Sequence, residues 1–184
     1  MMSEPSDYGD YKRLQRFLSS RVNRCNLNLI TVIKRALPIF RLFQGSLISK
    51  NIMLILKKEL FEQIVKECIK ELPNEACGIL AGKEERVEKI YEMANTDKSP
   101  STYFMDAKEQ FKVMKEIRNL GLEMLGIYHS HVASPARPSA RDVELAFYPE
   151  ASYVIVSLED KNNPCIRSFK IKEGTITEEE VKIE

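Results

Sequence analysis

The sequence predicts a mixed α/β (α+β) domain, in which helices and strands follow one another irregularly along the chain. Two helical patterns, with apolar residues every three or four positions, are separated by short apolar runs typical of buried strands. The chain has 184 residues, of which 43% are hydrophobic, and this is enough for one core of ordinary size. We place this domain at residues 53–184.

The first predicted element is a helix over residues 60–72, which Pro73 ends. Apolar residues recur in it at the spacing of a helix with one buried side. Its predicted buried stripe consists of Leu60, Phe61, Ile64, Val65, Cys68, Ile69 and Leu72. Two short apolar runs at 76–81 and 87–94 then predict a β-hairpin with a polar turn.

A second helix is predicted after Asp106, because this residue is a good N-cap, Glu109 follows three positions later and Gly121 lies just past the expected end. Its predicted buried side consists of Phe111, Met114, Ile117 and Leu120. The remaining predicted elements are an interior strand at 124–128, a short helix at 139–146, a strand at 152–158 and a hairpin at 165–171 and 175–183.

Residues 1–52 form a basic extension of a different composition. Nine Lys/Arg against three Asp/Glu give it a net charge of +6, and the 19 Lys/Arg and 24 Asp/Glu of the remainder leave −5. This composition suits a transit peptide or a basic amphipathic helix for a membrane surface or partner. The simpler interpretation, which we favour, is an accessory or upstream-translated segment, with Met53 as the true start.

The overall composition excludes several classes of protein. A net charge of +1 gives no reason to expect nucleic acid as the partner. The four cysteines form no C-x-x-C pair, so a reduced, cytoplasmic setting is predicted. No membrane span is expected, because charges and Pro38 interrupt the most apolar stretch, residues 27–48.

Both histidines of the chain, His129 and His131, lie in one tripeptide directly after the strand predicted at 124–128. On an extended backbone, side chains two residues apart point to the same face. Neutral imidazole is a good zinc ligand, so the pair supplies half of a metal site. Asp142 follows in the first turn of the next predicted helix, where a carboxylate is favoured. Two nitrogens, one oxygen and a fourth position for water form the donor set of a catalytic zinc site.

Hydrolysis at such a site needs a carboxylate that moves protons, and Glu75 is the best-placed candidate. It lies between Pro73 and a buried strand, where the fold has no need for an acid. Taken singly, these residues have plainer interpretations: Ser139 is an N-cap, Asp142 a first-turn acid and Glu75 a solvated loop residue. Cys77 is predicted to pack in the core.

The residues resemble the motif of the JAMM (MPN-plus, Mov34/MPN/PAD-1) zinc metalloproteases of the compact prokaryotic type. That motif is an upstream Glu, then H-[ST]-H, seven residues, Ser, two residues and Asp, and the chain matches it with Glu75, His129-Ser130-His131, Ser139 and Asp142. The surrounding sequences NEACGILAG, GIYHSH and ARPSARDVELA match too, and the resemblance covers about residues 54–183. Val132 departs from the pattern, because many members have proline there.

The resemblance implies an MPN fold, which is a curved mixed β-sheet flanked by helices with cytidine-deaminase-like layering. It implies that His129, His131 and Asp142 hold one zinc ion, with water in the fourth position. It also implies that Glu75 is the general acid/base and that Ser139 donates a hydrogen bond to the tetrahedral oxyanion.

The implied activity is hydrolysis of the peptide or isopeptide bond after the C-terminal Gly-Gly of a ubiquitin-like or sulfur-carrier protein. The chain is thus expected to be a deubiquitinase-like zinc metallopeptidase. The Gly-Gly tail would lie extended along a strand edge, and we expect its contact at the loop 95–106.

Three alternatives remain beside this prediction. The first is a non-catalytic MPN scaffold that binds partners. Scaffold members of the family lose metal ligands, whereas this chain keeps them all. The second is a non-haem iron oxygenase, which also uses two histidines and a carboxylate but normally in a different order. The third assigns a reactive role to Cys77, either as the nucleophile of a cysteine hydrolase or as a fourth ligand that closes a structural zinc site.

Overall fold

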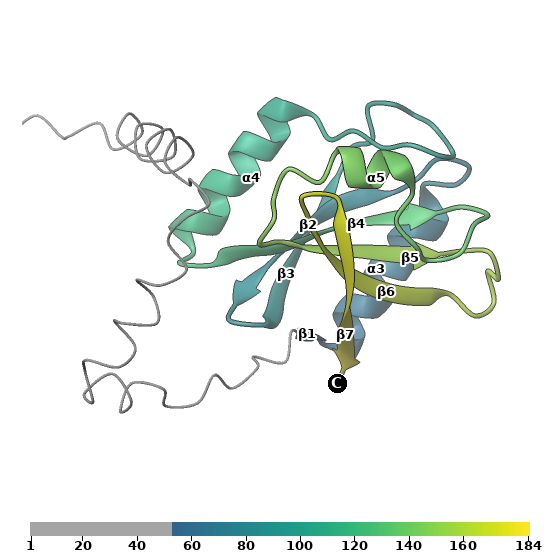
Figure 1. The fold of residues 1–184 in the computed structure, drawn as a ribbon. Coiled ribbons are helices and arrows are strands. Elements are labelled where there is room, and N and C mark those ends of the chain that lie inside the picture. The colour runs from purple at the N-terminus through teal and green to yellow at the C-terminus, as the bar shows by residue number, and fades with distance from the viewer. Residues whose placement is uncertain (1–52) are drawn as a thin grey trace, which may run out of the picture. The chain divides into compact units, whose positions relative to one another are not determined.

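The computed structural model describes residues 53–184. The predictions for residues 1–52 lie outside the described residues, and the domain boundary at residue 53 stays a prediction. In chain order (Figure 1), the elements are β1 (Met53–Leu56), α3 (Lys58–Lys70), β2 (Cys77–Lys83), β3 (Arg86–Met93), α4 (Ala107–Asn119), β4 (Glu123–His131), α5 (Ala140–Glu144), β5 (Ser152–Ser157), β6 (Cys165–Lys172) and β7 (Thr175–Ile183). This alternation confirms the predicted mixed α/β class.

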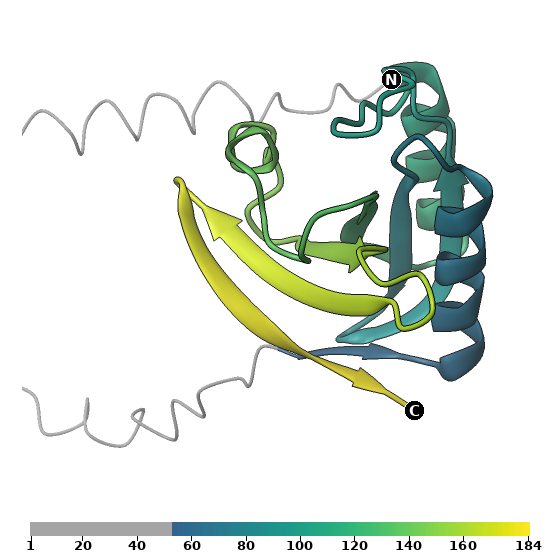
Figure 2. The same cartoon turned by 90° about the vertical axis from the view of Figure 1, so that its right-hand side faces the viewer.

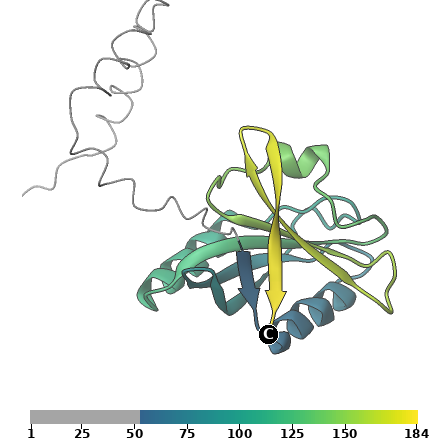
Figure 3. The same cartoon turned by 60° about the horizontal axis from the view of Figure 1, so that its bottom comes forward.

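The strands form one curved sheet that closes on itself in the order β1-β3-β2-β4-β5-β6-β7. It is mixed, because β1 runs parallel to both β3 and β7, and β4 runs parallel to β5, while the other pairs are antiparallel. Figure 2 shows the strong curvature of β6 and β7, and Figure 3 shows the end of β7 beside β1. The sequence pattern did not predict β1, whose four residues close the sheet.

Both predicted hairpins are confirmed, and each turn contains a residue with positive φ. The β2–β3 turn has Glu84 at φ 55°, and the β6–β7 turn has Glu173 at 50° and Gly174 at 77°. Two consecutive residues with positive φ match the right-handed twist of the strands that such a short turn joins.

The sheet buries a separate apolar cluster on each face, because alternate residues of a strand point to opposite sides. Along β4, Ile127 belongs to a cluster that α4 and α5 cover, whereas Tyr128 belongs to a cluster that α3 covers. The ribbon places α5 and α3 on opposite sides of β4 and β5 (Figure 1). The face that a residue of β4 occupies therefore decides which helices it meets.

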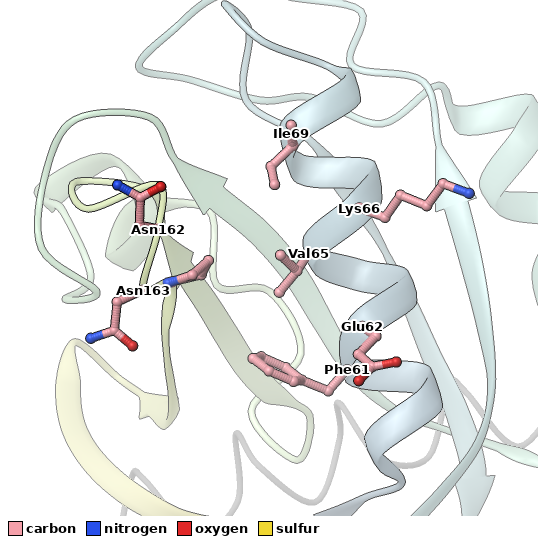
Figure 4. A pocket seen from close by; sticks show the side chains of 8 residues that line it. Phe61, Glu62, Val65, Lys66, Ile69, Asn162 and Asn163 are labelled. Atoms are coloured by element: carbon pink, nitrogen blue, oxygen red, sulfur yellow. The ribbon is translucent and has the colours of Figure 1, made fainter.

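Two details of the predicted helix faces are wrong. On α4, Ile117 is buried, but Phe111 and Leu120 are 73% and 51% exposed, so the real buried side is narrower than predicted. On α3, the deepest residues are Ile64 and Cys68. Of the rest of the predicted stripe, Phe61 and Val65 are partly buried against the core, but Ile69 is 46% exposed. These three residues line an open groove of about 420 Å³ against Asn162 and Asn163 (Figure 4). Helical spacing identifies the side that faces the sheet, and the neighbouring loops decide how much of it is covered.

A buried polar pair links α3 to β4 on the face opposite the histidines. Glu67 of α3 is 5% exposed, and its carboxyl accepts a hydrogen bond from the hydroxyl of Tyr128. Burial raises the pKa of Glu67 from 4.5 to about 7, although the bond from Tyr128 opposes the shift. The neutral carboxylic acid is therefore the favoured form of Glu67 in the folded protein at pH values below 7.

This pair predicts a stability that falls as the pH rises. Between pH 4.5 and about 7 the folded state holds a proton on Glu67 that the unfolded chain has released, so the free energy of unfolding decreases by up to about 3 kcal/mol. Glu67→Gln should remove the part of this dependence that Glu67 contributes, whereas Glu59→Gln, on the exposed first turn of α3, should leave the whole dependence unchanged. Urea unfolding of the three proteins at pH 5 and pH 8 measures the effect. An equal loss of stability in Glu67→Gln and the unaltered chain would contradict it.

Candidate metal centre

β4 holds both histidines inside the sheet rather than beyond its end. The predicted strand stops at Tyr128, whereas the actual strand continues through His131. His129 pairs with Cys77 of β2 on one side and with Ile155 of β5 on the other. Being two residues apart on a continuous strand, the two imidazoles project to the same face, which is the face covered by α4 and α5.

The third candidate ligand, Asp142, is oriented by the start of α5. The Ser139 hydroxyl oxygen accepts from the Asp142 backbone N–H at 3.2 Å, and one Asp142 carboxylate oxygen, Oδ2, accepts from the Ser139 N–H at 2.7 Å. This reciprocal capping box confirms that Ser139 is the N-cap of the helix. It also holds the Asp142 carboxylate in one direction, toward the histidines.

The ligand atoms of the three residues converge. His129 Nε2 and His131 Nε2 lie 3.1 Å apart, Asp142 Oδ1 lies 3.4 Å from His129 Nε2, and Asp142 Oδ2 lies 3.5 Å from His131 Nε2. Ligands about 2.0–2.1 Å from a tetrahedral zinc ion are separated by roughly 3.3 Å, so these spacings fit such an ion. Within residues 53–184, this is the one cluster of His, Cys, Asp or Glu side chains grouped closely enough to hold a metal.

The electrostatics of the cluster favour the metal-binding forms of Asp142 and His129, but not that of His131. Burial tends to raise the pKa of Asp142, but the bonds with His129, His131 and Ser139 prevail and hold it well below its usual range. Burial lowers the pKa of His129 and keeps its ring neutral, although Asp142 opposes this shift. Burial opposes charge on His131 as well, but Asp142 and the Pro135 carbonyl raise its pKa overall.

His131 is anchored from its far side. Its Nδ1–H donates to the backbone carbonyl of Pro135 at 2.8 Å, which leaves Nε2 with a lone pair for a metal. The loop that carries Pro135 is tied down by the Ser157 hydroxyl, which donates to the Ser134 carbonyl at 2.7 Å. These bonds fix the loop that follows Val132.

Glu75 lies at the margin of the same centre, in the segment between α3 and β2. It is 4% exposed, and its backbone N–H donates to the Ser99 carbonyl at 2.9 Å. Burial raises the pKa of its carboxyl to about 7, against the charge of His131, and Asp142 raises it further. The plainer interpretation as a solvated loop residue is therefore wrong, and the carboxyl titrates in the range that suits proton transfer.

A family model described as prokaryotic homologs of the JAB domain matches residues 57–172. The chain belongs to this family. The CysO-cysteine peptidase of Mycobacterium tuberculosis is 39% identical over 133 residues, which cover 71% of this chain and 91% of that protein. A probable TtuB-protein conjugate cleaving protease of Thermus thermophilus is 34% identical over 125 residues, which cover 67% of this chain and 80% of that protein.

The solution structure of a protein from Desulfitobacterium hafniense is similar with a TM-score of 0.67 and 43% sequence identity, over 72% of this chain and 93% of that one. Together these comparisons confirm the JAMM resemblance and the fold class predicted from the sequence. These two relatives are named as a peptidase and a protease, which confirms the predicted hydrolase class.

Cys77 contributes to the core of this JAB domain and not to the metal cluster. Its side chain is fully buried, and its thiol donates to the Met93 carbonyl at 3.6 Å. Burial raises its pKa to about 12, which keeps it protonated and poorly nucleophilic. Among the described residues it is also absent from the group of potential metal ligands. The structure thus favours the prediction of a core cysteine over both chemical roles considered for it.

Sequence reasoning missed two residues that support the centre, Asn95 and Tyr103. The Tyr103 ring stacks on His129, and the Asn95 amide donates to the carbonyl oxygens of Glu75 and Thr102. Asn95 lies two residues before Asp97, whose N–H bonds to its side chain, and such an Asx turn is a recognisable local signal. No local signal marks Tyr103, because its contact joins positions that are far apart in the sequence.

Proposed function

We propose that this chain is a zinc metallopeptidase that hydrolyses the peptide or isopeptide bond after the C-terminal Gly-Gly of a ubiquitin-like or sulfur-carrier protein. The observation that carries the proposal is the convergence of two imidazole nitrogens and one carboxylate at spacings of 3.1–3.5 Å. Three protein ligands leave a coordination position for water or substrate, which is the pattern of catalytic rather than structural zinc sites.

The donor set fits zinc, and His129, His131 and Asp142 would hold one ion. When bound, zinc would polarise the scissile carbonyl and lower the pKa of a water nucleophile. The chain itself supplies the orientation of the metal ligands. His131 and Asp142 are pre-oriented by the Pro135 carbonyl and by the capping box, so little reorganisation is needed on binding.

Glu75 would move the proton. As a carboxylate it accepts a proton from the attacking water, and as the acid it delivers this proton to the leaving amine. A pKa raised by burial to about 7 suits both steps near neutral pH. Ser139 would stabilise the oxyanion, because its oxygen accepts the Asp142 N–H while its own O–H proton stays available for donation.

The substrate class follows from the relatives and from the surroundings of the centre. One relative is named for CysO-cysteine and another for TtuB-protein conjugates. We place the extended Gly-Gly tail beside the loop 95–106, which borders the centre through the stack of Tyr103 on His129.

Within residues 53–184, every helix is too short or too polar to span a bilayer. We also propose a cytoplasmic setting, because the cysteines form no pattern typical of disulfide-bonded proteins.

The test uses the full chain loaded with zinc and a sulfur-carrier protein extended by a short peptide after its Gly-Gly. Intact mass measurement should detect one cut directly after the second glycine. A carrier whose Gly-Gly is replaced by Ala-Ala should resist cleavage, because the proposed specificity is for glycine at both positions.

The remaining outcomes distinguish the alternatives. No cut by a protein that binds one zinc per chain would overturn the substrate class and leave the metal site standing. No cut and no zinc would favour the non-catalytic scaffold. Incorporation of iron in place of zinc, with oxygen consumption, would favour the oxygenase.

A further inference from the structure

The two histidines of the centre are held in different ways. His131 has a hydrogen-bond partner for Nδ1 in the Pro135 carbonyl. His129 has none: within residues 53–184, its Nδ1 is the one buried side-chain nitrogen or oxygen that lacks a partner. Metal-binding histidines normally donate this second ring N–H to a carbonyl or carboxylate, which fixes the orientation of the ring. On the Nδ1 side, the His129 ring must therefore be held by packing.

Tyr103 supplies that packing. Its ring lies on the His129 imidazole with the two centroids 4.5 Å apart and the planes 22° from parallel. Such an offset stack restricts rotation of the imidazole about its side-chain bonds, since a turned ring would collide with the tyrosine. His129 is 1% exposed, so its Nδ1 has no contact with bulk solvent, and the contact with Tyr103 is made inside the domain.

Tyr103 is itself fixed by Asn95 through the residues on either side of it. The Asn95 amide group donates to the Thr102 carbonyl at 3.0 Å, and its oxygen accepts from the Phe104 N–H at 3.2 Å. A backbone bridge between Asn95 and Met105 closes the same loop. The amide of Asn95 also donates to the Glu75 carbonyl at 2.9 Å, which ties the loop to the proposed general acid/base.

We infer that Tyr103 is a positioning residue that replaces the missing hydrogen bond of His129 and holds its Nε2 toward the metal, and that Asn95 fixes Tyr103 in this position. The inference rests on the metal site of the proposed function. It assigns no role to the Tyr103 hydroxyl. Removal of the ring should therefore weaken the metal site, whereas removal of the hydroxyl alone should not.

The decisive measurement is zinc affinity by competition with a chromophoric chelator, made on the full chain. Tyr103→Leu should bind zinc about tenfold more weakly, while Tyr103→Phe should match the unaltered protein. Tyr91→Leu is the matched control, because Tyr91 is a buried tyrosine of the same apolar cluster whose hydroxyl bonds to Glu116. It should lose stability and keep its zinc affinity. The cobalt-substituted protein should show an altered visible absorption spectrum in Tyr103→Leu only.

Asn95→Ala tests the second part of the inference. It should weaken zinc binding in the same direction, and the double variant with Tyr103→Leu should be no worse than Tyr103→Leu alone, because both changes release the same ring. Cleavage should separate the two roles of Asn95. At saturating zinc, Asn95→Ala should lower kcat further than Tyr103→Leu does. The reason is that Asn95→Ala also removes the hydrogen bond to the backbone carbonyl of Glu75, the proposed general acid/base.

A measurement on the unaltered protein does not depend on whether the variants fold. The chain has two histidines, so the imidazole region of its NMR spectrum is simple. The stack should shift the ring protons of His129 upfield through the ring current of Tyr103, and Tyr103→Phe should preserve the shift. Absence of that shift would overturn the inference, as would equal zinc affinity in Tyr103→Leu and the unaltered protein. A chain that binds no zinc would instead overturn the proposed function, and the inference with it.

Discussion

Glu75→Gln is expected to lower the rate of cleavage after Gly-Gly by about 10²–10⁴-fold while the affinity for zinc stays unchanged. The amide has nearly the shape of the carboxyl group and preserves the local packing, but it cannot accept and return a proton. Glu75 is not among the three residues whose ligand atoms converge, so the metal should stay in place. Intact mass kinetics and chelator competition on the same samples measure the two quantities.

The control for this variant is Glu71→Gln, four residues earlier and outside the metal cluster. It should cleave at the rate of the unaltered protein. If Glu75→Gln cleaved as fast as Glu71→Gln, another group would have to move the proton. If Glu75→Gln lost its zinc together with its activity, the acid would be a ligand rather than a general acid/base.

The proposed role of Glu75 also predicts how the cleavage rate changes with pH. Glu75 must be ionised to accept a proton, and burial raises its pKa to about 7 in the metal-free protein. A bound cation stabilises the carboxylate and lowers that pKa. The cleavage rate should therefore rise with pH and level off at or below about pH 7. This acid limb should vanish from the residual activity of Glu75→Gln.

Asp142→Asn is expected to lower zinc affinity by more than about 100-fold and to abolish cleavage at limiting zinc. The neutral amide oxygen is a much weaker ligand than the carboxylate, whose charge also favours the metal. The amide oxygen can still accept the Ser139 N–H, so the capping box of α5 is retained and the loss is not one of folding. Chelator competition and thermal unfolding of the metal-free protein separate the two effects.

Glu144→Gln is the matched change on the same short helix, because Glu144 is an exposed acid that pairs with Arg141. Its zinc affinity and activity should equal those of the unaltered protein. Full zinc affinity in Asp142→Asn would exclude Asp142 as a ligand and leave the two histidines with a different partner.

Much of the candidate centre could be predicted from the sequence, because short local patterns mark its residues. Alternation along a strand placed His129 and His131 on one face, and the signature of a helix start placed Asp142 beside its own N-cap. Both rules depend on backbone geometry within a few residues. The same reason explains the confirmed hairpins and the overall class of the fold.

The tertiary structure decided how these parts are covered and held. Closure of the sheet by β1 and the exposure of Phe111 on α4 depend on which elements meet across the domain. The raised pKa of Glu75 depends on burial that no local pattern reports.

The support of His129 by Tyr103 joins positions 26 residues apart, and Glu67 and Tyr128 are separated by 61. The sequence by itself therefore determined which side chains are the candidates for the chemistry, since ligand type and periodicity are local properties. Only the folded chain decided which neighbours orient them and set their protonation, because burial and packing arise from contacts between distant segments.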